Sequence, residues 1–470
     1  MPRKYPIFLE KIQILDTAAE GKAIARYNNK VIFVPYAAPG DVMDINIMRR
    51  RKRFLEADIV KIHEFSPLRT TPFCSHFGIC GGCKWQHLKY EAQLQQKQQQ
   101  IKDHFERIAK VEVGEYLPIL PASPQQYYRN KLEFTFSNSG WRTKEAMQSL
   151  SEEEKQADYN VLGFHVPGFY DKIVDVEHCY LQANPSNEIR LFVKELAQKQ
   201  GLVFYSIRQH QGFLRSLIIR TTAEGEFMLI PVFKSDIPEK IQPFLDAIIA
   251  AFPAISSIYY YINPKTNDDF SDLEAIHYHG KTHITEKMED LSFQIGPKSF
   301  FQTNSKQAYA LYKIVREFAD LKGEEVVYDL YTGTGTIANF IANKAKKVLG
   351  IEYIEEAVND AAQNAMLNAI ENTHFLCGDM VKALNDKVVE QFGAPDVIIS
   401  DPPRAGMHPK VVEQILKIKP KRIVYISCNS STQARDVAML QEDYRLVKSQ
   451  AVDMFPHTHH IENVVLLEKK

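Results

Sequence analysis

The sequence contains only six cysteines in 470 residues, and they are spread unevenly along the chain. A disulfide-bonded secreted scaffold needs a denser set, so we expect no disulfide framework. No early stretch joins a basic start to an apolar segment and a small-residue cleavage site, and no apolar run is long enough to span a membrane. These absences predict a cytoplasmic protein without a membrane partner.

A net charge of either sign is nearly absent as well, since 57 Lys and Arg stand against 58 Asp and Glu. The balance is uneven, because residues 1–62 contain 12 basic and seven acidic residues, including the run Arg49–Arg53. Such a run is commonly a solvated surface, and RNA binding is the alternative. The composition is that of a globular protein, and the length predicts two to three domains.

Residues 1–62 are expected to form a small β-barrel of the oligonucleotide-binding kind. Short apolar runs of strand character occur at residues 7–14, 31–35 and 42–48. The basic run falls on the last expected hairpin. Three aromatic rings suit stacking on bases, although core packing explains them equally well: Tyr27, Phe33 and Tyr36.

Three cysteines follow in a C-x5-C-x2-C spacing: Cys74, Cys80 and Cys83. Two glycines between the last pair let the chain wrap around one metal centre. A fourth thiolate is the missing ligand, and Cys179 is the remaining candidate before the last third of the chain. Four thiolates suit both tetrahedral zinc and an iron–sulfur cluster, so the spacing leaves both open. Cys377 lies in an apolar run and is expected to be buried.

The middle of the chain changes from helix to strand character. Residues 90–110 predict a helix with a narrow apolar stripe. From residue 124 to about 288 we expect a mixed, largely antiparallel domain, interrupted at 145–160 by a charged, turn-rich segment expected to be a mobile loop. On one expected strand, Arg129 and Lys131 would either contact phosphates or simply be solvated.

From about residue 290, apolar strands alternate with helical segments. The strands are expected at 326–331, 347–352, 374–379, 396–401 and 422–427. This alternation predicts an α/β fold with a parallel, doubly wound sheet. Ligands bind such sheets at the carboxyl edge, where three polar turns should meet: 329–335, 400–406 and 427–429.

The first of these turns indicates a cofactor site. Gly333 and Gly335 allow the backbone to approach a ligand at a helix N-terminus. Glu352 follows at the tip of the next expected strand, where a carboxylate can accept both ribose hydroxyls of an adenosine. The third glycine of a dinucleotide site is missing, because the chain continues with Thr336. This favours S-adenosylmethionine over NAD.

The other two turns indicate methylation at carbon. Similar Asp-Pro-Pro turns occur in enzymes that methylate exocyclic amines, but there an aromatic residue follows, and here Arg404 follows. C5 of a pyrimidine becomes nucleophilic only after a thiolate adds to C6, and Cys428 can supply that thiolate. Glu462 is the candidate base for the C5 proton, with three histidines as rivals: His457, His459 and His460.

Together these motifs resemble those of the S-adenosylmethionine-dependent RNA uracil-C5 methyltransferases, in particular the branch that acts on 23S ribosomal RNA. The resemblance covers essentially the whole chain and rests on the four cysteines and on Phe300–Asn304, Asp329–Gly335, Asp401–Gly406, Ser427–Asn429 and His460–Glu462. One departure is Ser430, where the family usually has proline.

The resemblance implies three domains. Residues 1–62 would form a TRAM domain that binds RNA. A central iron–sulfur and RNA-binding domain would comprise 63–92 and 124–288, and a Rossmann-like methyltransferase domain would comprise 93–123 and 289–470. The helix at 90–110 should therefore pack on the catalytic domain, although the central domain separates the two in sequence.

The resemblance also implies residue roles. The four cysteines would hold a [4Fe–4S] cluster rather than zinc, Cys428 would be the nucleophile and Glu462 the base that completes 5-methyluridine. Arg129 and Phe300 would contact RNA. Eight residues would lie at the cofactor or the target base: Gln302, Tyr331, Gly333, Gly335, Thr336, Glu352, Asp379 and Asp401.

Two other functions remain as alternatives. The first is methylation of transfer RNA at the same atom; those relatives generally lack the TRAM domain and the cluster, so the first 90 residues argue against it. The second is an iron–sulfur RNA-binding protein with a vestigial methyltransferase fold, which the intact Cys428 and Glu462 argue against. We expect a monomer, because the RNA supplies the large interface.

Overall fold

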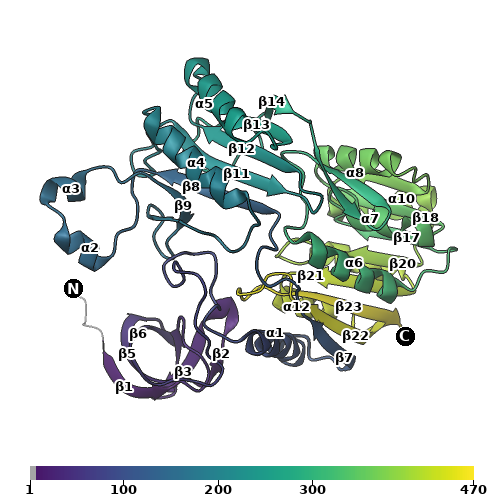
Figure 1. Cartoon of the computed structure of the whole chain (residues 1–470). Coiled ribbons are helices and arrows are strands. Elements are labelled where there is room, and N and C mark those ends of the chain that lie inside the picture. The colour runs from purple at the N-terminus through teal and green to yellow at the C-terminus, as the bar shows by residue number, and fades with distance from the viewer. Residues whose placement is uncertain (1–6) are drawn as a thin grey trace.

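Four β-sheets organise the chain in the computed structural model, which describes residues 7–470 (Figure 1). The first six residues of the barrel expected at 1–62 lie outside the described residues. Within the described part of the chain, no helix is long and apolar enough to cross a membrane.

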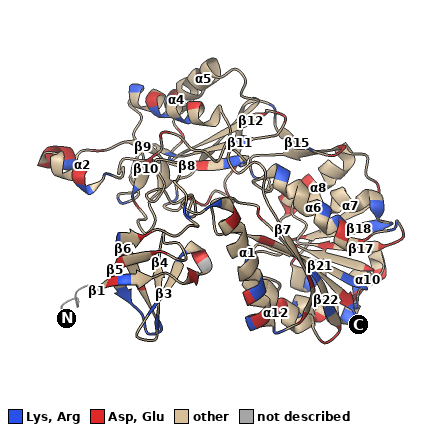
Figure 2. Cartoon of the chain, turned by 60° about the horizontal axis from the view of Figure 1, so that its bottom comes forward, with Lys and Arg blue, Asp and Glu red and all other residues tan. Residues whose placement is uncertain are grey.

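The N-terminal sheet has six strands in the order β1-β5-β6-β4-β3-β2. Its strands are β1 (Phe8–Gln13), β2 (Asp16–Thr17), β3 (Ala23–Tyr27), β4 (Lys30–Val34), β5 (Val42–Arg50) and β6 (Phe54–Glu64). Alternate apolar side chains such as Ile32 and Ile45 are buried in its interior. The basic run spans the end of β5 and the turn into β6, as expected (Figure 2).

The central sheet has seven strands in the order β10-β9-β8-β11-β12-β13-β14, and only β12 and β13 pair in parallel. This confirms the expected mixed, largely antiparallel domain. Helices α4 (Ser186–Lys199) and α5 (Pro238–Ala251) contribute to its core. The strands are β8 (Lys131–Ser137), β9 (Val161–His165), β10 (Ile173–Asp175), β11 (Leu214–Thr221), β12 (Phe227–Phe233), β13 (Ser257–Ile262) and β14 (Ile276–Gly280).

The segment at 145–160, expected to be a loop, contains two short helices, α2 (Lys144–Ser149) and α3 (Glu152–Gln156). Ser151 and Glu154 form a reciprocal capping box at the start of α3. The pattern of a serine followed three residues later by a glutamate is visible in the sequence, so this helix start was predictable. The segment projects away from the sheets (Figure 1).

The C-terminal sheet has eight strands in the order β19-β18-β17-β20-β21-β23-β22-β7. The five expected strands are all present and parallel: β17 (Val326–Leu330), β18 (Lys347–Glu352), β19 (Thr373–Cys377), β20 (Val397–Ser400) and β21 (Arg422–Ser427). Three unpredicted strands extend it, with β23 antiparallel to β21: β7 (Val113–Leu120), β22 (Tyr444–Val452) and β23 (Glu462–Lys469).

Helices cover both faces of this sheet (Figure 1). They are α6 (Ser305–Ala319), α7 (Thr336–Ile341), α8 (Glu355–Leu367), α9 (Met380–Ala383), α10 (Asp386–Phe392), α11 (Pro409–Ile418) and α12 (Ser430–Leu440). On β19, an edge strand, Cys377 is exposed. Its expected burial is therefore wrong, because among residues 7–470 no further strand pairs with β19 at that edge.

The expected helix at 90–110 is present as α1 (Tyr90–His104), continued by a π-helical turn, Phe105–Ala109. It packs against α12, β22 and β7 of the C-terminal sheet, as expected. Ile101 and Phe105 are fully buried there. Burying an aliphatic or aromatic side chain contributes about 1.5–3 kcal/mol each, so this contact fixes α1 firmly.

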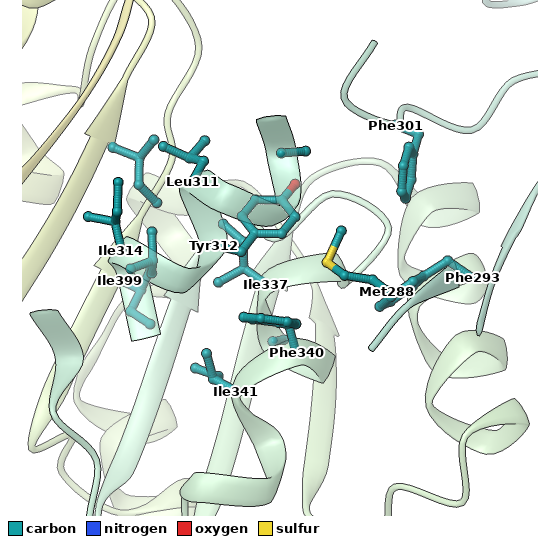
Figure 3. Close-up of a cluster of buried hydrophobic side chains, with 14 of the residues drawn as sticks. Met288, Phe293, Phe301, Leu311, Tyr312, Ile314, Ile337, Phe340, Ile341 and Ile399 are labelled. Atoms are coloured by element: carbon teal, nitrogen blue, oxygen red, sulfur yellow. The ribbon is translucent and has the colours of Figure 1, made fainter. Parts of the chain in front are cut away.

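A hydrophobic cluster joins the hairpin of β15 (Ile284–Met288) and β16 (Leu291–Ile295) to the C-terminal sheet. Figure 3 shows Met288 and Phe293 of the hairpin facing Tyr312 of α6 and Phe340 of α7. Phe301 belongs to the same cluster, so hydrophobic packing anchors the segment 300–304.

Candidate active site

A pocket of ≈ 900 Å³ opens at the carboxyl edge of the C-terminal sheet. It lies where an α/β sheet places its ligands. Of the residues predicted from the sequence, it is lined by Phe300, Gln302, Tyr331, Gly333, Thr336, Glu352, Asp379, Asp401, Cys428 and Glu462. The convergence of the three polar turns is therefore confirmed.

The glycine turn after β17 has two different constraints. Gly333 lines the pocket with a φ of 56°, a conformation that glycine adopts without a steric cost. Gly335 faces the protein instead, since a Cβ there would lie 2.7 Å from the Cβ of Ala361 and 3.0 Å from the ring of Phe375. Gly335 thus allows close packing of α7 rather than direct approach to a ligand.

Glu352 is held in one orientation at the tip of β18. Its Oε2 accepts a hydrogen bond from the backbone N–H of Gly333 at 3.1 Å. Its Oε1 accepts from the N–H groups of Tyr353 and Ile354 at 2.8 and 3.0 Å. A carboxylate fixed at this edge is suited to bind the ribose hydroxyls of a nucleoside.

Two carboxyl groups and a thiol converge from adjacent strands. Asp401 follows β20, Cys428 follows β21, and Glu462 begins β23, three consecutive strands of the sheet. Burial raises the pKa of Asp401 to about 7. Burial also raises the pKa of Glu462 well above its usual value, the charge of Asp401 adds to this, and Arg404 opposes it. A carboxyl group with a pKa of about 7, such as that of Asp401, can exchange protons near neutral pH.

The thiol of Cys428 is half-buried. Burial and, to a smaller extent, the charges of Glu462 and Asp401 raise its pKa to about 11, and Arg404 opposes this shift. Cys428 also lies two residues before α12, whose N-terminus favours negative charge. Arg404 and the helix are therefore the features that stabilise the thiolate.

Arg404 is a site residue to which sequence reasoning gave no role. Its Nη2 lies 3.1 Å from Nδ1 of His460, and its carbonyl accepts hydrogen bonds from Asn429 and Thr432 at 3.0 and 3.1 Å. The sequence did mark this residue as unusual. In enzymes that methylate amines an aromatic residue follows the two prolines, and here an arginine follows them. Tyr312 and Phe455 also line the pocket, and nothing in the sequence marked them.

The three rival histidines lie outside the pocket lining, whereas Glu462 is part of it. Burial lowers the pKa of His457 and of His460 to about 4, and that of His459 to about 3. His457 is fixed by Gln93 of α1, which accepts from its backbone N–H at 2.8 Å. The histidines thus belong to the loop before β23, and of these four side chains only that of Glu462 lines the pocket.

The cysteine segment contacts this same loop. The backbone N–H groups of Lys84 and Trp85 both donate to the carbonyl of His457 at 2.9 Å. Lys84 immediately follows Cys83. The segment that carries three of the cysteines is therefore joined directly to the loop that leads to Glu462.

The four cysteines Cys74, Cys80, Cys83 and Cys179 line one pocket. Burial raises the pKa of Cys80 and of Cys83 to about 12, and the neighbouring thiols add to this effect. Within residues 7–470, however, no group of three or more His, Cys, Asp or Glu side chains has the geometry to hold a metal ion. The cysteines converge, but not at the spacing of a single-ion site.

A buried arginine lies beside the cysteine pocket. Arg190 is 0 % exposed, and its Nη2 donates to the carbonyl of Glu177 at 2.9 Å. Its Nε and Nη1 have no hydrogen-bond partner. Burial lowers its pKa to about 10, and the nearby Cys179 favours its charged form. An unpaired buried cation is costly, so this place suits an anionic group.

The two residues expected to contact RNA occupy different places. Phe300 is 66 % exposed at the rim of the main pocket. Arg129 does not line that pocket, and its guanidinium lies 5.4 Å from the centre of the Phe455 ring. The structure thus leaves Phe300 open to a ligand, while Arg129 supports a residue of the pocket.

Family models match both ends of the chain. The model described as tRNA (Uracil-5-)-methyltransferase matches residues 279–470, and the TRAM domain of tRNA (uracil(54)-C(5))-methyltransferase matches residues 11–68. The expected TRAM domain is therefore confirmed. Because this TRAM model belongs to a transfer RNA enzyme, the TRAM domain by itself does not argue against transfer RNA as the substrate.

Relatives match over nearly the full length. An "Uncharacterized RNA methyltransferase" of Porphyromonas gingivalis is 52 % identical over 97 % of this chain and 99 % of its own. A second, of Chlorobaculum tepidum, is 37 % identical over 92 % of this chain and 90 % of its own. The crystal structure of Pyrococcus abyssi tRNA (uracil-54, C5)-methyltransferase in complex with S-adenosyl-L-homocysteine is 30 % identical, with a TM-score of 0.74 over 97 % of this chain and all of that one.

Proposed function

We propose that this chain, which belongs to the RNA uracil-5-methyltransferase family, transfers the methyl group of S-adenosylmethionine to C5 of a uridine in 23S ribosomal RNA. The observation that carries the proposal is the convergence of Cys428, Asp401 and Glu462 in one pocket with the nucleoside-binding edge at Gly333 and Glu352. The relative with bound S-adenosylhomocysteine supports the choice of cofactor.

The reaction follows from the side chains in the pocket. The thiolate of Cys428 adds to C6 of uracil, and the resulting enolate attacks the sulfonium methyl group from C5. The bond between the sulfonium sulfur and the methyl carbon breaks, which leaves S-adenosylhomocysteine. Glu462 then removes the C5 proton, C5=C6 reforms, and the thiolate is expelled. Arg404 stabilises the thiolate before attack, as its lowering effect on the pKa of Cys428 supports.

The cofactor would lie along the strand tips. We assign Glu352 to the ribose hydroxyls and the turn at Tyr331 and Gly333 to close backbone contact. Gln302, Thr336 and Asp379 line the same pocket and would complete its lining. Asp401, whose charge raises the pKa of Glu462, would contact the target base, and Gly335 shapes the turn through packing.

We propose further that the four cysteines hold a [4Fe–4S] cluster. Two observations fit this group: four thiols share a pocket without single-ion geometry, and Arg190 has two unpaired buried nitrogens beside them. A cluster with four thiolates is larger than one ion and anionic, so it would separate the sulfurs and pair with the arginine. Its contribution is structural, because methyl transfer from a sulfonium needs no electron transfer.

In this proposal, the RNA is bound by residues 1–62 and by the central domain of 63–92 and 124–288, while 93–123 and 289–470 catalyse the reaction. The uridine must leave its stack to enter the pocket, and the exposed ring of Phe300 at the rim can contact the displaced nucleotides. Arg129 supports that surface. The enzyme acts as a monomer.

Transfer RNA is the second candidate substrate. The similar Pyrococcus abyssi structure is of a transfer RNA uracil-54 enzyme, and so is the TRAM model that matches this chain. The chemistry is the same for both RNAs, so the pocket residues do not discriminate between them.

Nucleoside mass spectrometry tests both candidates. Anaerobically purified protein and S-adenosylmethionine are incubated with unmodified transcripts of 23S ribosomal RNA or of transfer RNA, with Cys428→Ala as the control. We expect 5-methyluridine in the ribosomal RNA only with the intact cysteine. Methylation of transfer RNA alone would overturn the substrate, and no methylation of either RNA would overturn the reaction.

A further inference from the structure

A second pocket, of ≈ 390 Å³, opens beside the catalytic pocket and shares part of its lining, namely Phe300, Ile354 and Ala357. Strands β8 and β11 of the central sheet supply two cations to it, Lys131 and Arg220. The pocket therefore lies between the central and catalytic domains, next to the place proposed for the target base.

Arg220 is held in this pocket without an acidic partner. It is 6 % exposed, and its Nη2 donates to the carbonyl of Ser299 at 2.7 Å. Its Nε has no hydrogen-bond partner, and neither has the hydroxyl of the nearby Tyr261. Burial lowers the pKa of Arg220 to about 10, so the side chain remains charged at neutral pH.

Lys131 lies directly opposite Arg220 in the antiparallel register of β8 and β11. Burial lowers the pKa of Lys131, and the charge of Arg220 lowers it further. Like charges opposite each other destabilise a sheet pair. Among the ion pairs formed by residues 7–470, none involves either of these two side chains. Two adjacent, partly desolvated cations that form no salt bridge favour an anionic ligand.

Three of the four acids that line this pocket have other partners. Asp268 pairs with Nη2 of Arg215 at 2.7 Å, Asp269 accepts from the N–H of Ser271 at 3.0 Å, and Asp360 accepts from the hydroxyl of Ser299 at 2.6 Å. Glu356 is exposed on α8. Glu133 lies on the same face of β8 as Lys131, and burial raises its pKa, which favours the neutral form.

We propose that Lys131 and Arg220 form a subsite for a backbone phosphate of the RNA, one that adjoins the target uridine. A phosphate oxygen can accept hydrogen bonds from both cations, and Phe300 lines both this subsite and the catalytic pocket. The inference rests on the proposed RNA methylation. It adds the position of the RNA backbone next to the target nucleotide.

The test compares Lys131→Gln with Lys306→Gln. Lys306 is exposed on α6, outside both pockets, and its replacement by Gln changes the total charge by the same amount. Dissociation constants for unmodified 23S ribosomal RNA and transfer RNA transcripts are measured over a range of salt concentrations, with S-adenosylhomocysteine present. We expect Lys131→Gln to weaken binding roughly tenfold and to reduce the slope of log K against log salt by about 0.7 to 1. Lys306→Gln should change neither.

A second readout separates a phosphate contact from a structural role. The affinity for S-adenosylmethionine and kcat should be unchanged in Lys131→Gln, while KM for RNA rises. Arg220→Lys, which keeps the charge, should bind more tightly than Arg220→Gln. An unchanged salt slope in a folded Lys131→Gln protein would overturn the subsite even if methylation occurs. A reduced slope without any methylation by the wild type would instead keep the subsite and overturn the reaction.

Discussion

The ammonium of Lys97 lies 2.6 Å from Oδ1 of Asp453, and neither side chain has any exposed surface. This ion pair joins α1 to the loop between β22 and β23, from which Glu462 follows. The hydroxyl of Tyr90 donates to the other oxygen of Asp453 at 2.8 Å, and Lys97 also donates to the carbonyl of Phe455 at 3.1 Å. The position of the proposed base thus depends on a helix more than 350 residues earlier in the chain.

Replacing Lys97 by Met should destabilise the protein by about 3–5 kcal/mol, because it leaves a buried aspartate without a partner. Urea unfolding measures this change. The double variant Lys97→Met with Asp453→Leu should recover most of the stability, since an apolar pair of similar volume often replaces a buried ion pair at little cost. An exposed lysine such as Lys306 serves as the matched control. Equal stability of Lys97→Met and wild type would contradict the prediction.

Glu462→Gln should separate methyl transfer from release of the product. Cys428 can still add to C6 and the methyl group can still move, but the C5 proton then has no base. We expect turnover to fall by roughly 10²–10⁴-fold and a protein–RNA adduct to accumulate that survives denaturation. Gel electrophoresis with labelled RNA detects the adduct. Cys428→Ala and the double variant Cys428→Ala with Glu462→Gln should form no adduct. An adduct in either would show that another residue is the nucleophile.

The raised pKa of Asp401 predicts a pH dependence of stability. An exposed aspartate titrates near about pH 4, whereas burial raises the pKa of Asp401 to about 7. Folding therefore favours the protonated form, and this contribution to stability is present below about pH 4 and is lost as the pH rises to about 7. Asp401→Asn should be more stable than wild type at pH 8 and similar to it at pH 4, while losing activity. Urea unfolding from pH 4 to pH 8 measures the difference in unfolding free energy between the variant and wild type. A difference that stays constant across this range would refute the prediction.

Loss of one cysteine ligand should affect more than the cysteine pocket. In Cys80→Ser, the unpaired Arg190 and the three remaining thiols lose the proposed anionic group between them. We expect folding stability and RNA affinity to fall together, with loss of iron and of the cluster absorbance. Cys377→Ser, at an exposed position away from this pocket, is the control. A folded, iron-free and fully active Cys80→Ser protein would exclude a structural role for the cluster.

The residues that sequence reasoning placed correctly are those at the tips of parallel strands. Glu352, Asp401 and Cys428 each follow an apolar run, and sheet geometry alone brings such positions to one edge. Tyr312 and Phe455 reach the same pocket by packing, and their sequence neighbourhood resembles that of core residues. The phosphate subsite depends on the register of β8 and β11, which no periodicity in one strand determines.

Other differences have local causes. Cys377 sits in an apolar run, but β19 is the edge strand, and the order of strands is not encoded in that run. The helix α3 was missed although Ser151 and Glu154 form its capping box, because the charged composition of the segment outweighed that signal. Long-range pairing and edge position were therefore the information that the sequence did not provide.

The pairing of β7 with β22 has a consequence for synthesis of the protein. β7 ends at Leu120, and its partner strand begins at Tyr444, so the edge of the catalytic sheet cannot close until almost the whole chain has left the ribosome. The N-terminal barrel and the central sheet have their strands earlier and can form first. During that interval the apolar faces of α1 and β7 are exposed to solvent, and β7 has an unpaired strand edge. We therefore expect truncated chains that lack the last 30 residues to aggregate.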